Sequence, residues 1–69
     1  MPLTPLERKA QMVLKEITQV ALAAELGVTQ SSISMVVSGE RRNAVIEEAI
    51  ARALGMPVDV VFGTDPVAA

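Results

Sequence analysis

A chain of 69 residues forms one domain with a modest core, and without Cys or His it has no disulfide or His/Cys metal site to reinforce that core. Its hydrophobic half contains one Phe and no Trp or Tyr, which favours packed helices over a sheet, and no apolar run approaches the ~20 residues of a membrane span. The net charge of -2 argues against a generally basic surface. We therefore predict an all-α, cytoplasmic protein without a cofactor, for which dimerisation is the remaining means of stabilisation.

The first predicted helix begins at Pro5, with Thr4 as its cap, and runs to about Lys15. Its apolar residues recur at helical spacing and predict the face that packs on the core. The charged and polar residues Glu7, Arg8, Lys9, Gln11 and Lys15 are assigned to the remaining faces. The predicted core stripe consists of Leu6, Ala10, Val13, Leu14 and Ile17.

Two short helices follow, separated by a turn of two residues, Gly27 and Val28. Thr18 caps the first of them and Gly27 ends it, because Gly most easily takes the left-handed conformation at a helix end. Thr29 caps the second and Gly39 ends it. The residues predicted to face inward are Leu22, Ala23 and Leu26 in the first helix and Ile33, Val36 and Val37 in the second.

A polar loop at 40–43 leads to a fourth helix, capped by Asn43 and ended by Gly55. Its predicted core stripe is Ile46, Ile50, Ala53 and Leu54. A short final helix at about 58–62 brings Val61 or Phe62 to the core. We predict a domain at 1–62 and a disordered tail at 63–69.

The two helices at 18–39 must cross steeply because their connection is so short. Ala23 is small enough for the close crossing, while Val28 and Ile33 supply anchoring contacts. The second helix is thereby free to project from the domain while the first braces it. This geometry is the one that insertion into a DNA groove requires.

A resemblance to the lambda-repressor and Cro superfamily, also called the XRE family, lies in the segment ITQVALAAELGVTQSSISMVVSGE. The later segment IARALGMPVDVVFG is similar to the end of such domains, and it most resembles the small Ner-like phage regulators. The resemblance implies a compact four- to five-helix lambda-repressor-like DNA-binding domain, with its helix-turn-helix at about residues 18–39. The residues that match the family pattern are Thr18, Gln19, Leu22, Ala23, Leu26, Gly27, Val28, Ile33, Ser34 and Gly39.

Base contacts are expected from the exposed face of the second helix of this motif. Gln30 and Ser31 occupy its first turn, where Gln can bond bidentately to adenine and Ser can pair with several bases. Ser34 and Met35 continue that face, and Met35 can contact a thymine methyl. Many family members carry a polar or basic residue where Met35 stands.

Contacts to the DNA backbone are expected from residues around the motif. The resemblance implies a phosphate contact for Gln19, at a helix N-terminus that itself favours an anion. Residues 1–42 hold five of the six basic side chains and four of the eight acids, so this part is mildly basic. The remaining expected backbone contacts are Thr29, Ser32, Ser38, Arg41 and Arg42.

These assignments predict a sequence-specific regulator of transcription, most simply a repressor that binds a two-fold operator as a homodimer. One alternative is an antitoxin, which would bind DNA and also a toxin or another protein partner. A second alternative is a protein-interaction domain that has lost DNA binding. Enzyme activity is not predicted, because the chain has no His, Cys or Gly-rich phosphate loop and the adjacent Glu47 and Glu48 point to different sides of a helix.

Several side chains have a second interpretation. Ser31, Ser32 and Ser34 can be solvated helix surface, and Arg41 and Arg42 can form salt bridges to acids such as Glu47. Two locations, the core and a dimer surface, are compatible with the apolar side chains of Val20, Ala21 and Phe62.

Overall fold

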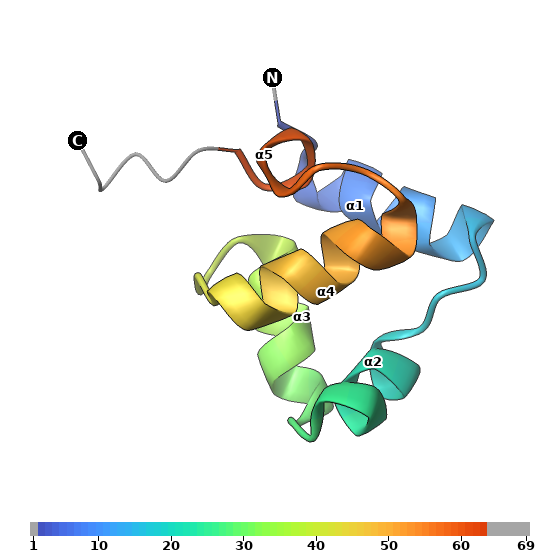
Figure 1. Ribbon diagram of the computed structural model, residues 1–69, viewed down its shortest axis with the longest axis vertical. Coiled ribbons are helices and arrows are strands. Elements are labelled where there is room, and N and C mark those ends of the chain that lie inside the picture. Colours follow the sequence, from blue (N-terminus) through green and yellow to red (C-terminus); the bar gives the residue numbers. More distant parts are fainter. Residues whose placement is uncertain (1, 64–69) are drawn as a thin grey trace.

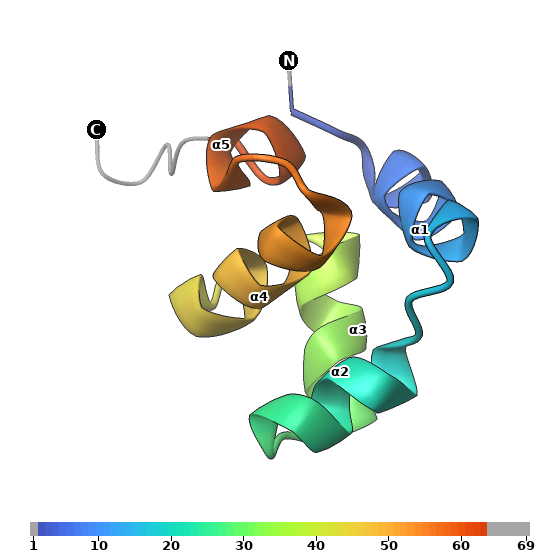
Figure 2. The same cartoon turned by 45° about the vertical axis from the view of Figure 1, so that its right-hand side comes forward.

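The computed structural model describes residues 2–63, which form five helices and no strand (Figure 1). Helix α3 runs through the middle of the molecule, with α1 on one side, α4 on the other and α2 across its start (Figure 2). The all-α fold class is confirmed. The helices are α1 (Pro5–Leu14), α2 (Gln19–Leu26), α3 (Gln30–Ser38), α4 (Ala44–Leu54) and α5 (Val58–Val61).

All four predicted helix caps are confirmed. The side chains of Thr4, Thr18, Thr29 and Asn43 each accept a hydrogen bond from a backbone N–H in the first turn of the helix that follows. Each cap satisfies one of the N–H groups that a helix start leaves unpaired. Gly27, which follows α2, has φ +71°, so the predicted left-handed end is present as well.

Helices α2 and α3 are bent by 117° relative to each other across the turn at 27–29, as the short connection predicts. No single helix in residues 2–63 is long and apolar enough to cross a membrane, and only this bent pair passes such a test of length and composition.

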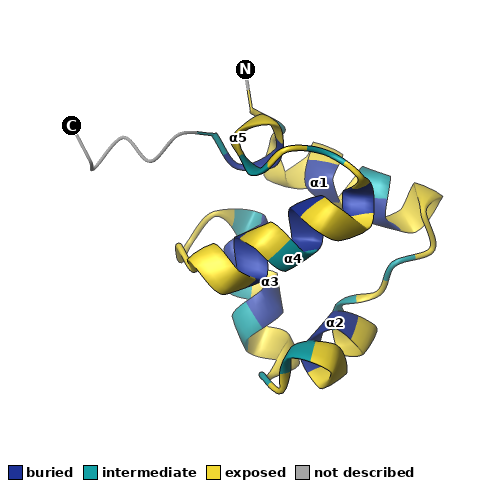
Figure 3. Cartoon of the chain, viewed as in Figure 1, coloured by how far each residue is buried: buried dark blue, intermediate teal, exposed yellow. Residues whose placement is uncertain are grey.

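The core lies where α3, α4 and α5 meet the inner sides of α1 and α2 (Figure 3). Ile33, Val37, Ile50 and Val61 have no accessible surface at all. Phe62 is 8% exposed, so the core interpretation of this residue is confirmed, whereas Val20 and Ala21 are exposed. The other buried apolar residues are Met12, Leu22, Ala23, Val36, Ile46, Ala51 and Leu54.

The predicted core face of the first helix is wrong. Leu6, Val13 and Leu14 are 77%, 75% and 74% exposed, Ala10 is exposed and Ile17 is half-buried. The residues of α1 that are buried are Arg8 and Met12. At 3.6 residues per turn these two lie on the side opposite to the apolar stripe, so the helix is rotated by about half a turn from the predicted orientation.

Arg8 explains the rotation. Its Nε donates to the carbonyl of Val37 at 2.7 Å, and its Nη1 donates to the carbonyls of Leu3 at 2.6 Å and Val61 at 3.0 Å. The guanidinium carbon also lies 4.8 Å from the centre of the Phe62 ring, within the range of a cation–π contact. Burial lowers the pKa of Arg8 and the nearby charge of Arg42 lowers it further, although Glu47 raises it. Even so, an arginine stays protonated in proteins, so the side chain keeps all its donors.

A smaller error concerns the fourth helix, where Ala53 is exposed and Ala51 is buried instead. The core stripe is otherwise as predicted, at Ile46, Ile50 and Leu54. Residues 64–69, most of the predicted disordered tail, lie outside the described part of the chain. Gly63 is described, and its carbonyl accepts a hydrogen bond of 3.4 Å from Arg42.

We predict that Arg8→Met lowers the free energy of unfolding by about 3 kcal/mol, because buried carbonyl groups lose their donor. Urea denaturation followed by far-UV circular dichroism measures the change. Lys15→Met, at an exposed position just after the same helix, is the control and should change stability by less than about 0.5 kcal/mol. Superimposable unfolding curves for the two variants would contradict the role assigned to Arg8.

Candidate nucleic-acid interface

Helix α3 is anchored along one face and free along the other. Ile33, Val36 and Val37 point into the core and are at most 1% exposed. The Thr29 hydroxyl fixes the start of the helix by accepting from the Ser32 N–H at 3.2 Å. The helix ends at Gly39, which has φ +87°. A helix held in this way presents its outer side chains in a defined orientation.

The four residues predicted to read bases share that outer face. At 100° per residue, Gln30, Ser31, Ser34 and Met35 occupy one continuous sector of α3, which begins at the edge of the buried sector with Gln30 and extends to the far side of the helix with Met35. The first three are exposed and Met35 is half-buried. The side chains of Gln30, Ser31 and Ser34 make no hydrogen bond within residues 2–63, so their donors and acceptors are available to another molecule. Their contact with bases stays a prediction.

The three hydroxyl side chains among the predicted backbone contacts already have partners within the protein. The hydroxyls of Thr29 and Ser32 lie 3.0 Å apart in the helix cap. The Ser38 hydroxyl lies 3.1 Å from the Met35 carbonyl and 3.1 Å from a carboxylate oxygen of Glu40. A phosphate near Ser38 would meet that carboxylate, so this is the least favourable of the predicted phosphate positions.

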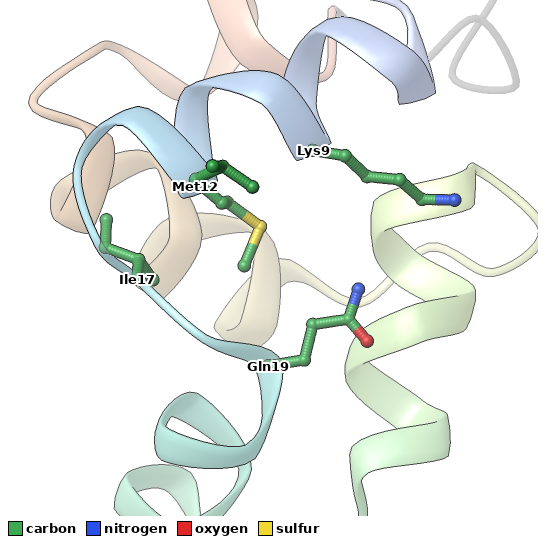
Figure 4. Close-up of a pocket in the computed structure, with 5 residues that line it drawn as sticks. Lys9, Met12, Ile17 and Gln19 are labelled. Atoms are coloured by element: carbon green, nitrogen blue, oxygen red, sulfur yellow. The ribbon is translucent and has the colours of Figure 1, made fainter.

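Gln19 begins α2 and is half-buried. Its side chain faces a hollow that Lys9 reaches from α1, and the two side chains extend toward α3 (Figure 4). Met12, Val13 and Ile17 form the rest of the lining. Sequence reasoning missed Lys9, because it oriented α1 by the apolar stripe. Lys9 lies about 60° around the helix from Met12, so a correct placement of Met12 would have brought Lys9 to this side.

The two arginines of the loop at 40–43, Arg41 and Arg42, differ in whether they pair with an acidic side chain. Arg42 donates from Nε to Glu47 Oε2 at 2.8 Å and from Nη2 to Glu47 Oε1 at 3.2 Å. The Glu47 side chain is nearly buried and also accepts from the Asn43 N–H. The salt bridge considered for Arg42 is therefore present, and a phosphate contact by Arg42 would have to compete with it. Arg41 is exposed and forms no ion pair among the described residues.

Few positively charged side chains are available to bind the phosphates of DNA. Arg8 is buried, Arg42 pairs with Glu47, and Arg52 pairs with Glu48 at 3.0 Å. The exposed basic side chains that have no ion-pair partner within residues 2–63 are Lys9, Lys15 and Arg41. Each phosphate that a cation neutralises adds about 0.9 to the slope of log K against log salt, so we expect a modest slope for one copy.

Helices α2 and α3 are joined by a short turn, α3 is anchored in the core, and the polar outer face of α3 is free. This arrangement defines a helix-turn-helix protein. A family model described as helix-turn-helix matches residues 9–61. The chain therefore belongs to the XRE, or lambda-repressor-like, helix-turn-helix family, whose members bind DNA and regulate transcription.

No curated protein and no solved structure was found to match the chain. The similarity to Ner-like regulators and the domain boundary at residue 62 stay predictions.

We predict that Gln30→Ala and Arg41→Ala have different effects on DNA binding. Gln30→Ala should relax the preference at one base position, at a cost of about 1–3 kcal/mol, because a bidentate base contact is lost. Arg41→Ala should weaken binding to all sequences alike and lower the salt slope by about 0.9. Binding of both variants to a panel of duplexes at several salt concentrations separates the two effects. If both behave like the parent protein, the assignment of the site is wrong even though the fold is right.

Proposed function

We propose that the protein is a sequence-specific repressor of transcription that binds a two-fold operator as a homodimer, with α3 in the major groove. The observation that carries this proposal is the outer face of α3, where Gln30, Ser31 and Ser34 are exposed and without intramolecular hydrogen bonds. These side chains suit base edges better than phosphates, because they offer directed donors and acceptors without charge. Occupying a promoter in the cytoplasm of a bacterium, or of a phage host, would block transcription there.

The small number of free cations supports binding as a pair. One copy offers Lys9, Lys15 and Arg41, which is few for tight binding of DNA. Two linked copies double the number of contacts, and the second copy binds at a high effective concentration. The half-sites of such an operator would lie about one helical turn of DNA apart, roughly 34–36 Å.

The outer face of α1 supports a second copy as the partner. Leu6, Val13 and Leu14 are each about three-quarters exposed, and Ala10 lies among them. Isolated exposed apolar residues are common on protein surfaces, but a stripe of them on one helix favours association. None of these residues belongs to the outer face of α3, so a contact through α1 does not use the residues predicted to read DNA.

Selection from a library of randomised duplexes at moderate salt tests the function. We expect the enriched sequences to share one motif with two-fold symmetry, because two identical recognition helices read both halves. Binding of the enriched duplexes should weaken as salt increases. If the selection enriches no motif and binding does not depend on salt, the proposal is wrong and the protein-interaction alternative is favoured.

Sedimentation at micromolar concentration tests the dimer and its surface. We expect the double variant Leu6→Glu/Leu14→Glu to weaken dimerisation by roughly tenfold or more, because it places charges in an apolar contact. Val45→Glu is the matched control, since Val45 is 68% exposed but lies on α4. A parent protein that stays monomeric even on its selected duplex would contradict the homodimer.

A further inference from the structure

An acidic side chain lies at the C-terminal end of the outer face of α3. At 100° per residue, Ser38 falls in the middle of the sector that the four predicted base-reading residues occupy. The Ser38 hydroxyl lies 3.1 Å from Glu40 Oε2, just beyond the helix end at Gly39. The exposed polar face of α3 therefore ends at a carboxylate, although the sequence assigned no role to Glu40.

The position of this carboxylate relative to α3 is defined by both backbone and side chain. Gly39, with φ +87°, turns the chain out of the helix, and the Glu40 N–H then donates to the Met35 carbonyl at 2.9 Å. The Ser38 hydroxyl contacts the same carbonyl at 3.1 Å and so lies between it and Glu40. Glu40 is exposed and forms no ion pair within residues 2–63.

A carboxylate at this place is unfavourable for the protein by itself and for general attraction to DNA. The C-terminal end of a helix carries partial negative charge, which disfavours an anion nearby. Phosphates repel it as well. Stability and non-specific binding thus leave Glu40 unexplained, whereas a role in choosing between base sequences would offset both costs.

The chemistry of the base edges restricts what Glu40 can meet in the major groove. A carboxylate only accepts hydrogen bonds. Guanine presents the acceptors O6 and N7, and thymine presents the acceptor O4, so both would face a negative oxygen with an acceptor. Adenine offers its N6 amino group but places the acceptor N7 beside it. Cytosine offers its N4 amino group without an adjacent acceptor, so it is the best partner.

We propose that Glu40, held by Ser38, is a specificity-determining residue that accepts a hydrogen bond from the N4 amino group of one cytosine in each half-site. This inference rests on the proposed function, because it requires α3 to enter the groove. A half-site without that amino group leaves a desolvated carboxylate unpaired, which is costly, so Glu40 acts mainly by rejecting other bases. Ser38 lies about 10.5 Å along the helix from Ser31, so the cytosine lies about three base pairs from the base that Ser31 contacts.

Glu40→Gln is the test, on the duplex selected with the parent protein and on duplexes in which each base pair of the half-site is changed in turn. At one position, we expect replacement of cytosine by thymine or guanine to weaken binding of the parent by about tenfold or more. For Glu40→Gln the preference at that position should shift to adenine, because an amide both donates to N7 and accepts from N6.

Glu25→Gln is the matched control. Glu25 is also exposed and without an ion pair among the described residues, but it lies on α2 and lines a hollow with Ala49 and Arg52 of α4. It removes the same charge, so any general change in attraction to DNA should be similar. The preference for cytosine should remain as in the parent.

Ser38→Ala tests how the carboxylate is held. It should lower the discrimination by about threefold in the parent protein and have no such effect in the Glu40→Gln background, because Ser38 acts through Glu40. Unfolding curves for all variants establish that the fold is intact.

The outcomes separate the inference from the proposed function. If Glu40→Gln binds every duplex more tightly without changing any base preference, the carboxylate only repels phosphates, and the inference is wrong while the proposed function stands. A parent preference for adenine at this position would overturn the assignment of cytosine. If the parent protein enriches no motif and binds no duplex in a salt-sensitive manner, the proposed function fails and the inference fails with it.

Discussion

The arrangement of the helices depends on one buried cation. The guanidinium of Arg8 donates to carbonyls in three separate segments: the end of α3 at Val37, the N-terminal segment at Leu3 and helix α5 at Val61. Carbonyls at the end of a helix have no partner within that helix, and burying them without a donor is costly. A planar group with five N–H donors can serve several carbonyls at once, which an apolar side chain cannot do. The ring of Phe62 completes the site by covering the guanidinium.

The position of Arg8 determines which other side chains of α1 face solvent. Because Arg8 and Met12 face the core, the apolar residues Leu6 and Val13 face solvent, and Lys9 comes to the edge of the hollow that Gln19 shares. The same hydrogen bonds hold the C-terminal end of α3, whose apolar face is completely buried. A structural arginine thus sets the geometry of both proposed surfaces, the one for DNA and the one for a second copy, although it lies on neither.

The sequence predicts most of the fold because the decisive signals are local. Each cap lies next to the helix it begins, and a Gly follows the last residue of α2, α3 and α4. The orientation of α1 was not predictable in this way, because an apolar stripe looks the same when it faces a core as when it faces solvent or a partner. Arg8 contacts carbonyls 29 and 53 residues away, and such partners leave no periodic signal. For the same reason Lys9 was missed, whereas Gln30, Ser31 and Ser34 were found from their places in a local motif.

The acidic composition is consistent with a DNA-binding role. Three of the six basic side chains have partners within the protein, so most of the sequence specificity is assigned to the uncharged side chains on the outer face of α3.

The outer face of α3 is proposed to contact DNA. This contact is tested most directly by following backbone amide NMR signals while the selected duplex is added. We predict that the largest changes fall at 29–35, with smaller ones at Lys9, Gln19 and Arg41, and that α5 changes little. Changes centred on α4 and α5, or none at a saturating concentration of duplex, would contradict the account.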